Sequence, residues 1–177
     1  MQFIQKMAFN NLKPHISDAI KESCYRSDVR LYNIANEVQK IAIFSLEQGV
    51  ENSHDLSMII DKTIKDSVEL GCDLSVIAKG ILIGTFRSSA SKRSEAPQVM
   101  RVLINEILQY VSKYKGDMKE TVEGIVGGSV NIATQFQLNL PQTVVTTRED
   151  LLTSAGSISP KLAEEIKEYL SSIDDQK

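Results

Sequence analysis

The residues best suited to bind an anion form a short basic, hydroxyl-rich segment in the middle of the chain. Residues 87–94 read Arg-Ser-Ser-Ala-Ser-Lys-Arg-Ser, with three positive charges and no acidic residue. The segment ends just before a predicted helix, whose free backbone N–H groups favour anions. Arg87, Lys92 and Arg93 are therefore candidate anion contacts. The alternative is a solvated loop whose cations stabilise the end of the preceding helix.

No spacing of residues typical of catalysis or metal binding occurs elsewhere. His15 and His54 are the only histidines, and neither has a cysteine, histidine or carboxylate at a metal-ligand spacing. The sequence contains no HExxH motif, CxxC pair, phosphate-binding loop or nucleophile elbow. We therefore expect a protein that is not an enzyme and that uses no metal and no cofactor.

Two pairs of glycines are the least ordinary feature of the sequence. Gly80 and Gly84 are four residues apart, as are Gly124 and Gly128. Each pair therefore lies on one face of a predicted helix. A glycine inside a helix costs about 1 kcal/mol relative to alanine, which favours sites of close helix packing or an interface. The close neighbour is either another helix of the same chain or a second subunit or ligand. Insertion of these faces into a membrane is disfavoured, because charged residues interrupt the apolar runs.

Amphipathic helical segments carry these residues. The segments start near Ser, Asp or Asn and stop at glycine or proline, as helices do. One strand-like stretch, 142–147, is too short and isolated to imply a sheet. The sequence therefore predicts an all-α fold, a compact helical bundle or short solenoid. The predicted helices are 2–12, 15–26, 29–48, 53–70, 73–91, 97–115, 118–139, 148–155 and 160–172.

Particular residues are predicted to end and begin these helices. Left-handed C-caps are expected at Gly49, Gly71, Gly116 and Gly156. Pro141 is expected to end the helix before it, and Ser159 followed by Pro160 to begin the last helix. Asp117 has Glu120 three residues on, which is a capping-box pattern.

A pseudo-repeat of about 44 residues groups the helices into antiparallel hairpins. Sliding the chain by 44 residues places Asp73 on Asp117 and the first glycine pair on the second. The apolar positions of the preceding helices keep the same register, as in two-helix repeats. The predicted hairpins lie near 15–48, 53–91 and 97–139, and a C-terminal pair at 148–172 closes the chain.

The first residues, 1–14, form a basic amphipathic segment. Its charges are Lys6 and Lys13, and no acidic residue occurs before Asp18. The apolar residues on one side of the predicted helix are Phe3, Ile4, Met7 and Ala8. A helix that docks on a membrane surface or a partner has this composition, and so does a terminal helix packed on its own domain. The segment either packs on the rest of the domain or moves independently of it.

Length and composition describe a single soluble domain over residues 1–177. The chain is 42% hydrophobic and 24% charged, with a net charge of −3. This balance argues against a nucleic-acid-binding protein. No apolar run approaches the ~20 residues of a membrane span, and no signal peptide is visible, so a cytoplasmic location is expected. Cys24 and Cys72 lie in apolar helical segments and are expected to be reduced and buried. The alternative is a single disulfide or a redox pair.

These observations favour a non-enzymatic interaction or assembly protein. The helical hairpins and glycine faces predict a scaffold or adaptor that binds a protein partner or a second copy of itself, as a homo-oligomer. The alternative is a peripheral binder of a lipid or other anionic surface, through the N-terminal helix and the Arg87–Arg93 patch. A membrane surface is the less favoured partner.

Overall fold

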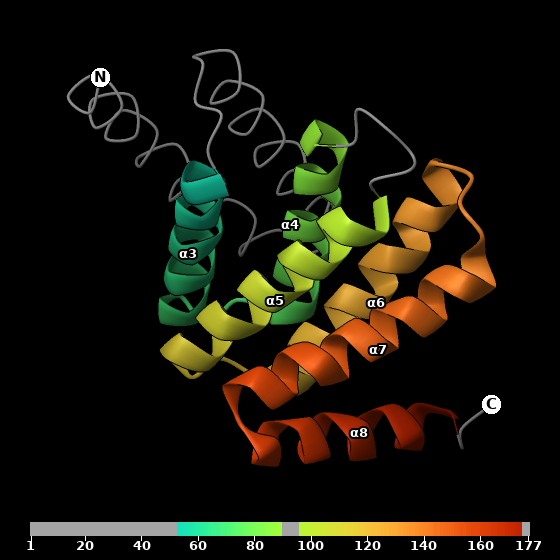
Figure 1. Ribbon diagram of the computed structural model, residues 1–177. Coiled ribbons are helices and arrows are strands. Elements are labelled where there is room, and N and C mark those ends of the chain that lie inside the picture. Colours follow the sequence, from blue (N-terminus) through green and yellow to red (C-terminus); the bar gives the residue numbers. More distant parts are fainter. Residues whose placement is uncertain (1–52, 90–95, 175–177) are drawn as a thin grey trace.

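The computed structural model describes residues 53–89 and 96–174, and this part of the chain forms six helices and no strand (Figure 1). The helices are α3 (Ser53–Glu69), α4 (Leu74–Ser89), α5 (Ala96–Tyr114), α6 (Met118–Gln135), α7 (Leu140–Ile158) and α8 (Pro160–Asp174). They pack into a compact bundle, which confirms the predicted all-α fold class. Several predicted features lie outside the described residues: helices 2–12, 15–26 and 29–48, His15, Cys24 and Gly49.

The core is built from aliphatic side chains, and its centre is the contact between α4 and α6. That contact is the most extensive in the bundle, while α3 lies mainly on α5. Helix α7 packs on both α5 and α6, and α8 crosses below α7 (Figure 1). The residues with no exposed surface include Ile81, Leu82, Ile104, Ile107, Leu108, Val122, Ile125, Ile132 and Leu151. Burial of such side chains contributes roughly 1.5–3 kcal/mol each to stability.

Within the two predicted hairpins, the successive helices are not each other's main partners. Helices α3 and α4 touch less extensively than α3 and α5 do, and α5 and α6 touch less extensively than α4 and α6 do. Among these four helices, the most extensive packing therefore joins those that the predicted 44-residue register aligns, α3 with α5 and α4 with α6.

The boundary between α6 and α7 differs from the prediction. The helix predicted over 118–139 ends at Gln135. Gln137 has a φ of 52°, the left-handed conformation that lets the chain leave a helix. A hydrogen bond from the backbone N–H of Leu138 to the carbonyl oxygen of Ala133, at 2.9 Å, closes the turn.

The strand-like stretch 142–147 is helical, because it is the start of α7. Asn139 caps this helix by accepting a hydrogen bond from the backbone N–H of Gln142 at 3.0 Å. Pro141 lies in the first turn of α7 and does not end the preceding helix. The β-branched residues of this stretch have only a weak preference for strands, which the cap and the burial of Thr147 override.

Three of the predicted glycine caps lie in the described part of the chain, and one of them forms. Gly71 ends α3 with a φ of +65°, as predicted. At the end of α5 the left-handed residue is Lys115, with a φ of 58°, and not Gly116. Gly116 is closely packed instead, since an added Cβ would lie 2.6 Å from the Leu74 methyl Cδ1, which would have to move. Gly156 lies inside α7, which continues to Ile158.

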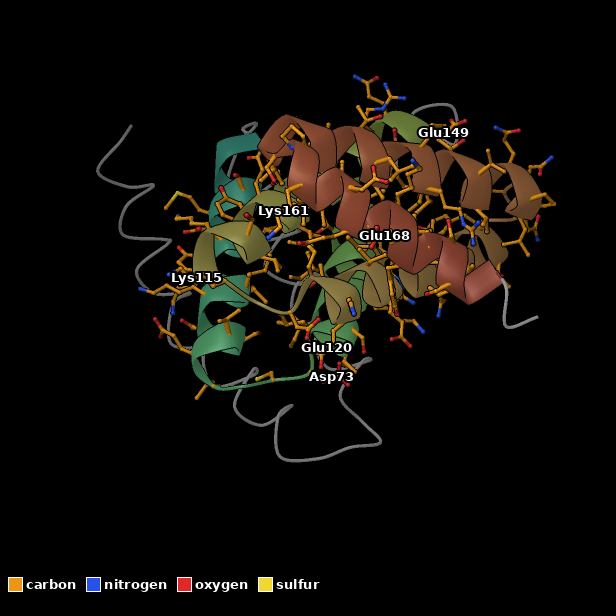
Figure 2. The ribbon with its side chains drawn as sticks, turned by 90° about the horizontal axis from the view of Figure 1, so that it is seen from below. Asp73, Lys115, Glu120, Glu149, Lys161 and Glu168 are labelled. Atoms are coloured by element: carbon orange, nitrogen blue, oxygen red, sulfur yellow. The ribbon has the colours of Figure 1, made fainter. Side chains whose placement is uncertain are left out.

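The predicted capping box at the start of α6 forms only in part. Asp117 accepts hydrogen bonds from two first-turn N–H groups of α6, at 2.9 and 3.0 Å. The carboxylate of Glu120 instead accepts a hydrogen bond from the backbone N–H of Leu74 at 2.9 Å. Asp73 caps the same end of α4 through the N–H of Ser75, at 2.9 Å. Figure 2 shows Glu120 and Asp73 close together, so residues of two helices cap the start of α4.

Cys72 lies in the turn between α3 and α4 and is half-buried. It is disulfide-bonded, and the described residues contain no free thiol. The expectation of a reduced thiol is therefore wrong for Cys72. Disulfides are rare in the cytosol, so the thiol state of Cys72 in the cell tests the predicted cytoplasmic location.

Candidate binding sites

The glycine face of α6 packs against α4 of the same chain. A Cβ at Gly124 would overlap the carbonyl oxygen of Ser75 and lie 2.9 Å from its Cα. A Cβ at Gly128 would lie 3.0 Å from the Leu82 methyl Cδ2 and 3.5 Å from the Cα of Lys79. The absence of a side chain at these two positions is therefore explained by helix packing within the chain.

The other glycine pair is also buried. Gly80 and Gly84 lie in the buried part of α4. Gly127, next to the α6 pair, has only ordinary contact with the side chain of Lys79, at 3.8 Å. Since Gly124 and Gly128 face the interior, an interaction surface has to be sought on other parts of the bundle.

Of the three predicted anion contacts, only Arg87 lies in the described part of the chain. The guanidinium of Arg87 donates hydrogen bonds to Oε1 of Gln135 on α6, from Nη2 at 2.8 Å and from Nε at 3.3 Å. Lys92 and Arg93 lie outside the described residues. Arg87 is thus held by α6, where it links the end of α4 to the end of its main packing partner.

Metal binding was also expected to be absent, and residues 53–89 and 96–174 can be searched for it. No group of three His, Cys, Asp or Glu side chains in these ranges is arranged to hold a metal ion. The side chain of His54 is not among those described. Within the same ranges, no helix is both long enough and apolar enough to cross a bilayer.

A groove of about 460 Å³ lies between the first turns of α6 and the outer helix α8. It stays open because α8 packs mainly on α7 and touches α6 only sparsely. Its apolar side is formed by Met118, Val122, Ile166 and Tyr169. Its polar rim is formed by Lys119, Glu165, Glu168 and Ser172. Figure 2 views the bundle from this side and labels Glu168 on α8.

The groove has an excess of negative charge. Two carboxylates line it, on Glu165 and Glu168, against the single ammonium of Lys119. Lys161 approaches Glu165 at 3.5 Å, but both side chains are largely exposed, so this pair is weak. The rim is therefore acidic around an apolar centre.

Carboxylates outside the rim add to the negative electrostatic potential of the groove. Desolvation raises the pKa of the Tyr169 hydroxyl, and the negative charges of Glu123 and Asp117 raise it further. Both carboxylates therefore act at the apolar centre of the groove. A cationic group near Tyr169 would be attracted by these charges.

A smaller cavity of about 190 Å³ lies where the start of α5 meets the start of α7. Ala96, Pro97, Met100 and Leu138 form its apolar wall. Its polar wall is formed by Asn139, Gln142, Thr143, Thr146, Thr147 and Asp150. Thr147 and Asp150 are 2% and 4% exposed, so this wall includes two buried polar side chains.

The Asp150 carboxylate is paired through only one of its oxygens. Nε of Arg101 donates a hydrogen bond to Oδ1 of Asp150 at 2.8 Å. The second oxygen, Oδ2, is buried and has no hydrogen-bond partner, and the same holds for Oγ1 of Thr147. Buried polar atoms are nearly always hydrogen-bonded, so these two oxygens are unusual for helix packing.

A polar seam between α3 and α5 contains a second unusual carboxyl group, that of Glu106. Burial raises the pKa of Glu106, although a hydrogen bond from Ser57 partly opposes this. The Ser57 hydroxyl also lies 2.6 Å from the Tyr110 hydroxyl. Nearby, Asp61 accepts hydrogen bonds from Lys113, which raises the pKa of that lysine, and from Tyr114, both at 2.8 Å. The seam pairs polar groups between two helices.

Comparison with known proteins assigns no family. The chain matches no protein-family model, and no characterised protein is significantly similar to it. The sites are therefore defined by their own geometry.

The sequence predicts neither the groove nor the cavity, because each joins residues from distant helices. The helix start at 139–141, which lines the cavity, has a local signal in Asn139 and Pro141. The sequence analysis predicts a helix end at Pro141 instead.

Proposed function

We propose that this protein is a non-enzymatic, self-associating interaction protein whose groove between α6 and α8 receives a basic amphipathic helix. The observation that carries the proposal is the combination of an apolar floor with an acidic rim. A groove between helices accepts the apolar face of an amphipathic helix. Carboxylates at its rim favour lysine or arginine at the edges of that face.

The occupant in this proposal is the N-terminal segment, residues 1–14, of a second copy of the chain. The segment has apolar residues on one side, the charges of Lys6 and Lys13, and no acidic residue before Asp18. Its lysines complement the glutamates of the rim. Docking between copies makes the protein a homo-oligomer.

The mass of the full-length protein in solution, measured by light scattering, tests this proposal. Glu165→Lys with Glu168→Lys reverses the charge of the rim, and Lys6→Glu with Lys13→Glu reverses that of the segment. Either pair alone should reduce the oligomer to a monomer, because like charges then face each other. All four changes together should restore the oligomer, because opposite charges face each other again.

A matched control uses exposed glutamates that do not line the groove. Glu149→Lys with Glu164→Lys makes the same change in net charge and should leave the mass unchanged. A monomeric wild type contradicts self-association. If the charge reversals in the rim and in the N-terminal segment leave the mass of the oligomer unchanged, the N-terminal segment is not the occupant of the groove. Docking of the segment within its own chain would also count against the proposal. It would appear as a monomer whose groove amides lose protection in the charge variants.

The proposal also includes the arrangement of the helices as repeated hairpins. We propose that 53–91 and 97–139 are two copies of one hairpin unit, with a fainter third at 15–48. Support comes from Asp73 and Asp117, which match in the 44-residue register and each cap the helix that follows. An experimental structure in which the two segments fail to superpose would contradict the repeat.

A further inference from the structure

We propose that the groove between α6 and α8 binds a primary alkylammonium group at Tyr169, and that a lysine side chain of the docked helix is held there. The assignment of the lysine rests on the proposed function, because it concerns the occupant of the same groove. The binding of an alkylammonium group depends on the groove alone.

Tyr169 reaches from α8 toward α6. It lines the groove between these two helices, and the negative charges of Glu123 and Asp117 act on its hydroxyl. Glu123 belongs to α6, and Asp117 caps the start of that helix. A hydroxyl that is carried by α8 and lies close to carboxylates of α6 is placed between the two helices, where a ligand in the groove would meet it.

The hydroxyl of Tyr169 is available to such a ligand. The residue is half-buried, and within the described part of the chain its hydroxyl forms no hydrogen bond. An ammonium group carries three donors and no acceptor. It can therefore donate to the hydroxyl oxygen while the nearby carboxylates attract its charge.

The apolar floor of the groove determines the rest of the ligand. Met118, Val122 and Ile166 line the groove together with Tyr169. A lysine side chain has the matching form, because its aliphatic stem packs along apolar surface while its ammonium stays at a polar edge. The N-terminal segment, residues 1–14, contains lysine and no arginine.

The charged groups disfavour an anion or a metal ion in the same place. The carboxylates of Glu165 and Glu168 outnumber the single ammonium of Lys119, so an anion would be repelled. Within residues 53–89 and 96–174, no three His, Cys, Asp or Glu side chains converge to hold a metal ion. An alkylammonium group needs fewer oxygen contacts than a metal ion, because its stem also packs on the apolar floor.

Four probes test the site: hexylammonium, hexanol, hexanoate and methylammonium. The first three share one stem and differ in the head group, and the last keeps the charge without the stem. Each is titrated into the full-length variant Lys6→Glu with Lys13→Glu, whose N-terminal segment the acidic rim repels, and backbone amides are followed by NMR. Hexylammonium should shift signals of α8 and of the first turns of α6 saturably, and the others should bind at least tenfold more weakly. No binding of hexylammonium, or equal binding of another probe, would overturn the proposal.

The variant Tyr169→Phe, made in the same background, locates the ammonium group. It removes the hydroxyl and keeps the ring, so hexylammonium should bind about tenfold more weakly. The melting temperature should not change, because the hydroxyl has no partner in the described part of the chain. Tyr114→Phe is the matched control, because Tyr114 lies outside the groove. Unchanged affinity in Tyr169→Phe, or an equal loss in Tyr114→Phe, would refute the assignment.

The alkylammonium site and self-association can fail independently of each other. With the lysines of the segment intact, Tyr169→Phe should make the oligomer dissociate at a higher protein concentration than the Tyr169 protein, as measured by light scattering. Unchanged dissociation would show that no lysine of the occupant is held at Tyr169. A monomeric wild type would overturn the assignment of the lysine together with self-association, while binding of hexylammonium at Tyr169 would still support the site.

Discussion

At the scale of single residues, Gly124 sets how closely α6 approaches α4. The backbone of Ser75 occupies the space that a side chain at Gly124 would need. A backbone oxygen in a helix cannot move without moving the helix. At Gly128 the nearest atom is the methyl Cδ2 of Leu82, which can rotate away. The two glycines therefore differ in how much a substitution should cost.

Gly124→Ala is expected to destabilise the protein. Overpacking costs roughly 1–3 kcal/mol, which outweighs the gain in helix propensity of up to ~1 kcal/mol. Gly156→Ala is the control, because nothing lies within 4 Å of its added Cβ and it is exposed inside α7. That variant should be more stable than wild type. The midpoints of urea unfolding measure both effects, and shifts of the same sign in the two variants would contradict the argument.

Glu106 predicts a dependence of stability on pH. Burial raises its pKa in the folded protein above the value in the unfolded chain. The folded state therefore binds this proton more tightly, and stability falls as pH rises from the unfolded pKa through the folded pKa. Glu106→Gln cannot ionise, and a buried neutral amide costs less than a buried charge.

The Glu106→Gln variant should therefore melt higher than wild type near neutral pH. The difference should vanish in acid, below the ordinary carboxylate pKa. Melting temperatures measured across this range provide the test, with exposed Glu149→Gln as the control that should show no such trend. An advantage of Glu106→Gln that is as large in acid as at neutral pH would exclude the ionisation of Glu106 as its cause.

At the scale of helices, the start of α4 depends on a residue of α6. Glu120 accepts a hydrogen bond from the backbone N–H of Leu74, so α6 supplies part of the cap of α4. Loss of a capping side chain typically costs about 1 kcal/mol. Glu120→Ala should lower the free energy of unfolding by about that amount.

Two comparison variants separate capping from general effects of charge. Glu120→Gln keeps a carbonyl oxygen at the same reach and should lose less stability than Glu120→Ala. Glu123→Ala removes an exposed carboxylate from the same helix and should have a smaller effect. Urea unfolding of the three variants gives the order. Equal losses in Glu120→Ala and Glu123→Ala would show that the cap contributes nothing measurable.

The helix boundaries show which parts of the fold can be predicted from the sequence and which cannot. The long amphipathic runs and the Ser159–Pro160 start predicted helices that are observed, because periodicity and caps are local properties of the sequence. The interpretation of 142–147 as non-helical is wrong, since its helix depends on the Asn139 cap and on packing of α7 against α5 and α6. The spacing of Gly124 and Gly128 predicts a close contact, but only the fold shows that their neighbour is α4. The groove and the cavity could not be predicted, because both exist only after distant helices dock.

At the scale of the whole molecule, the helices differ in how firmly they are held. The pair α4 and α6 forms the centre of the core. Helix α8 lies at the edge of the bundle, packed on α7 and sparsely on α6 (Figure 1). It contributes Ile166 and Leu170 to the core, which are 2% and 5% exposed. Elements with fewer buried contacts open at lower free energy than the core.

Backbone amides of α8 should therefore exchange with solvent faster than those of α4 and α6. Ile166→Ala should accelerate exchange in α8 without changing α4, because it loosens only the contact of the outer helix. Ile125→Ala, a comparable loss of volume at the α6 core, should accelerate exchange throughout the bundle. Hydrogen exchange followed by mass spectrometry resolves the helices. Equal protection of α8 and α4 would show that the bundle opens as one unit. The groove would then have rigid walls, and docking would have to occur without movement of α8.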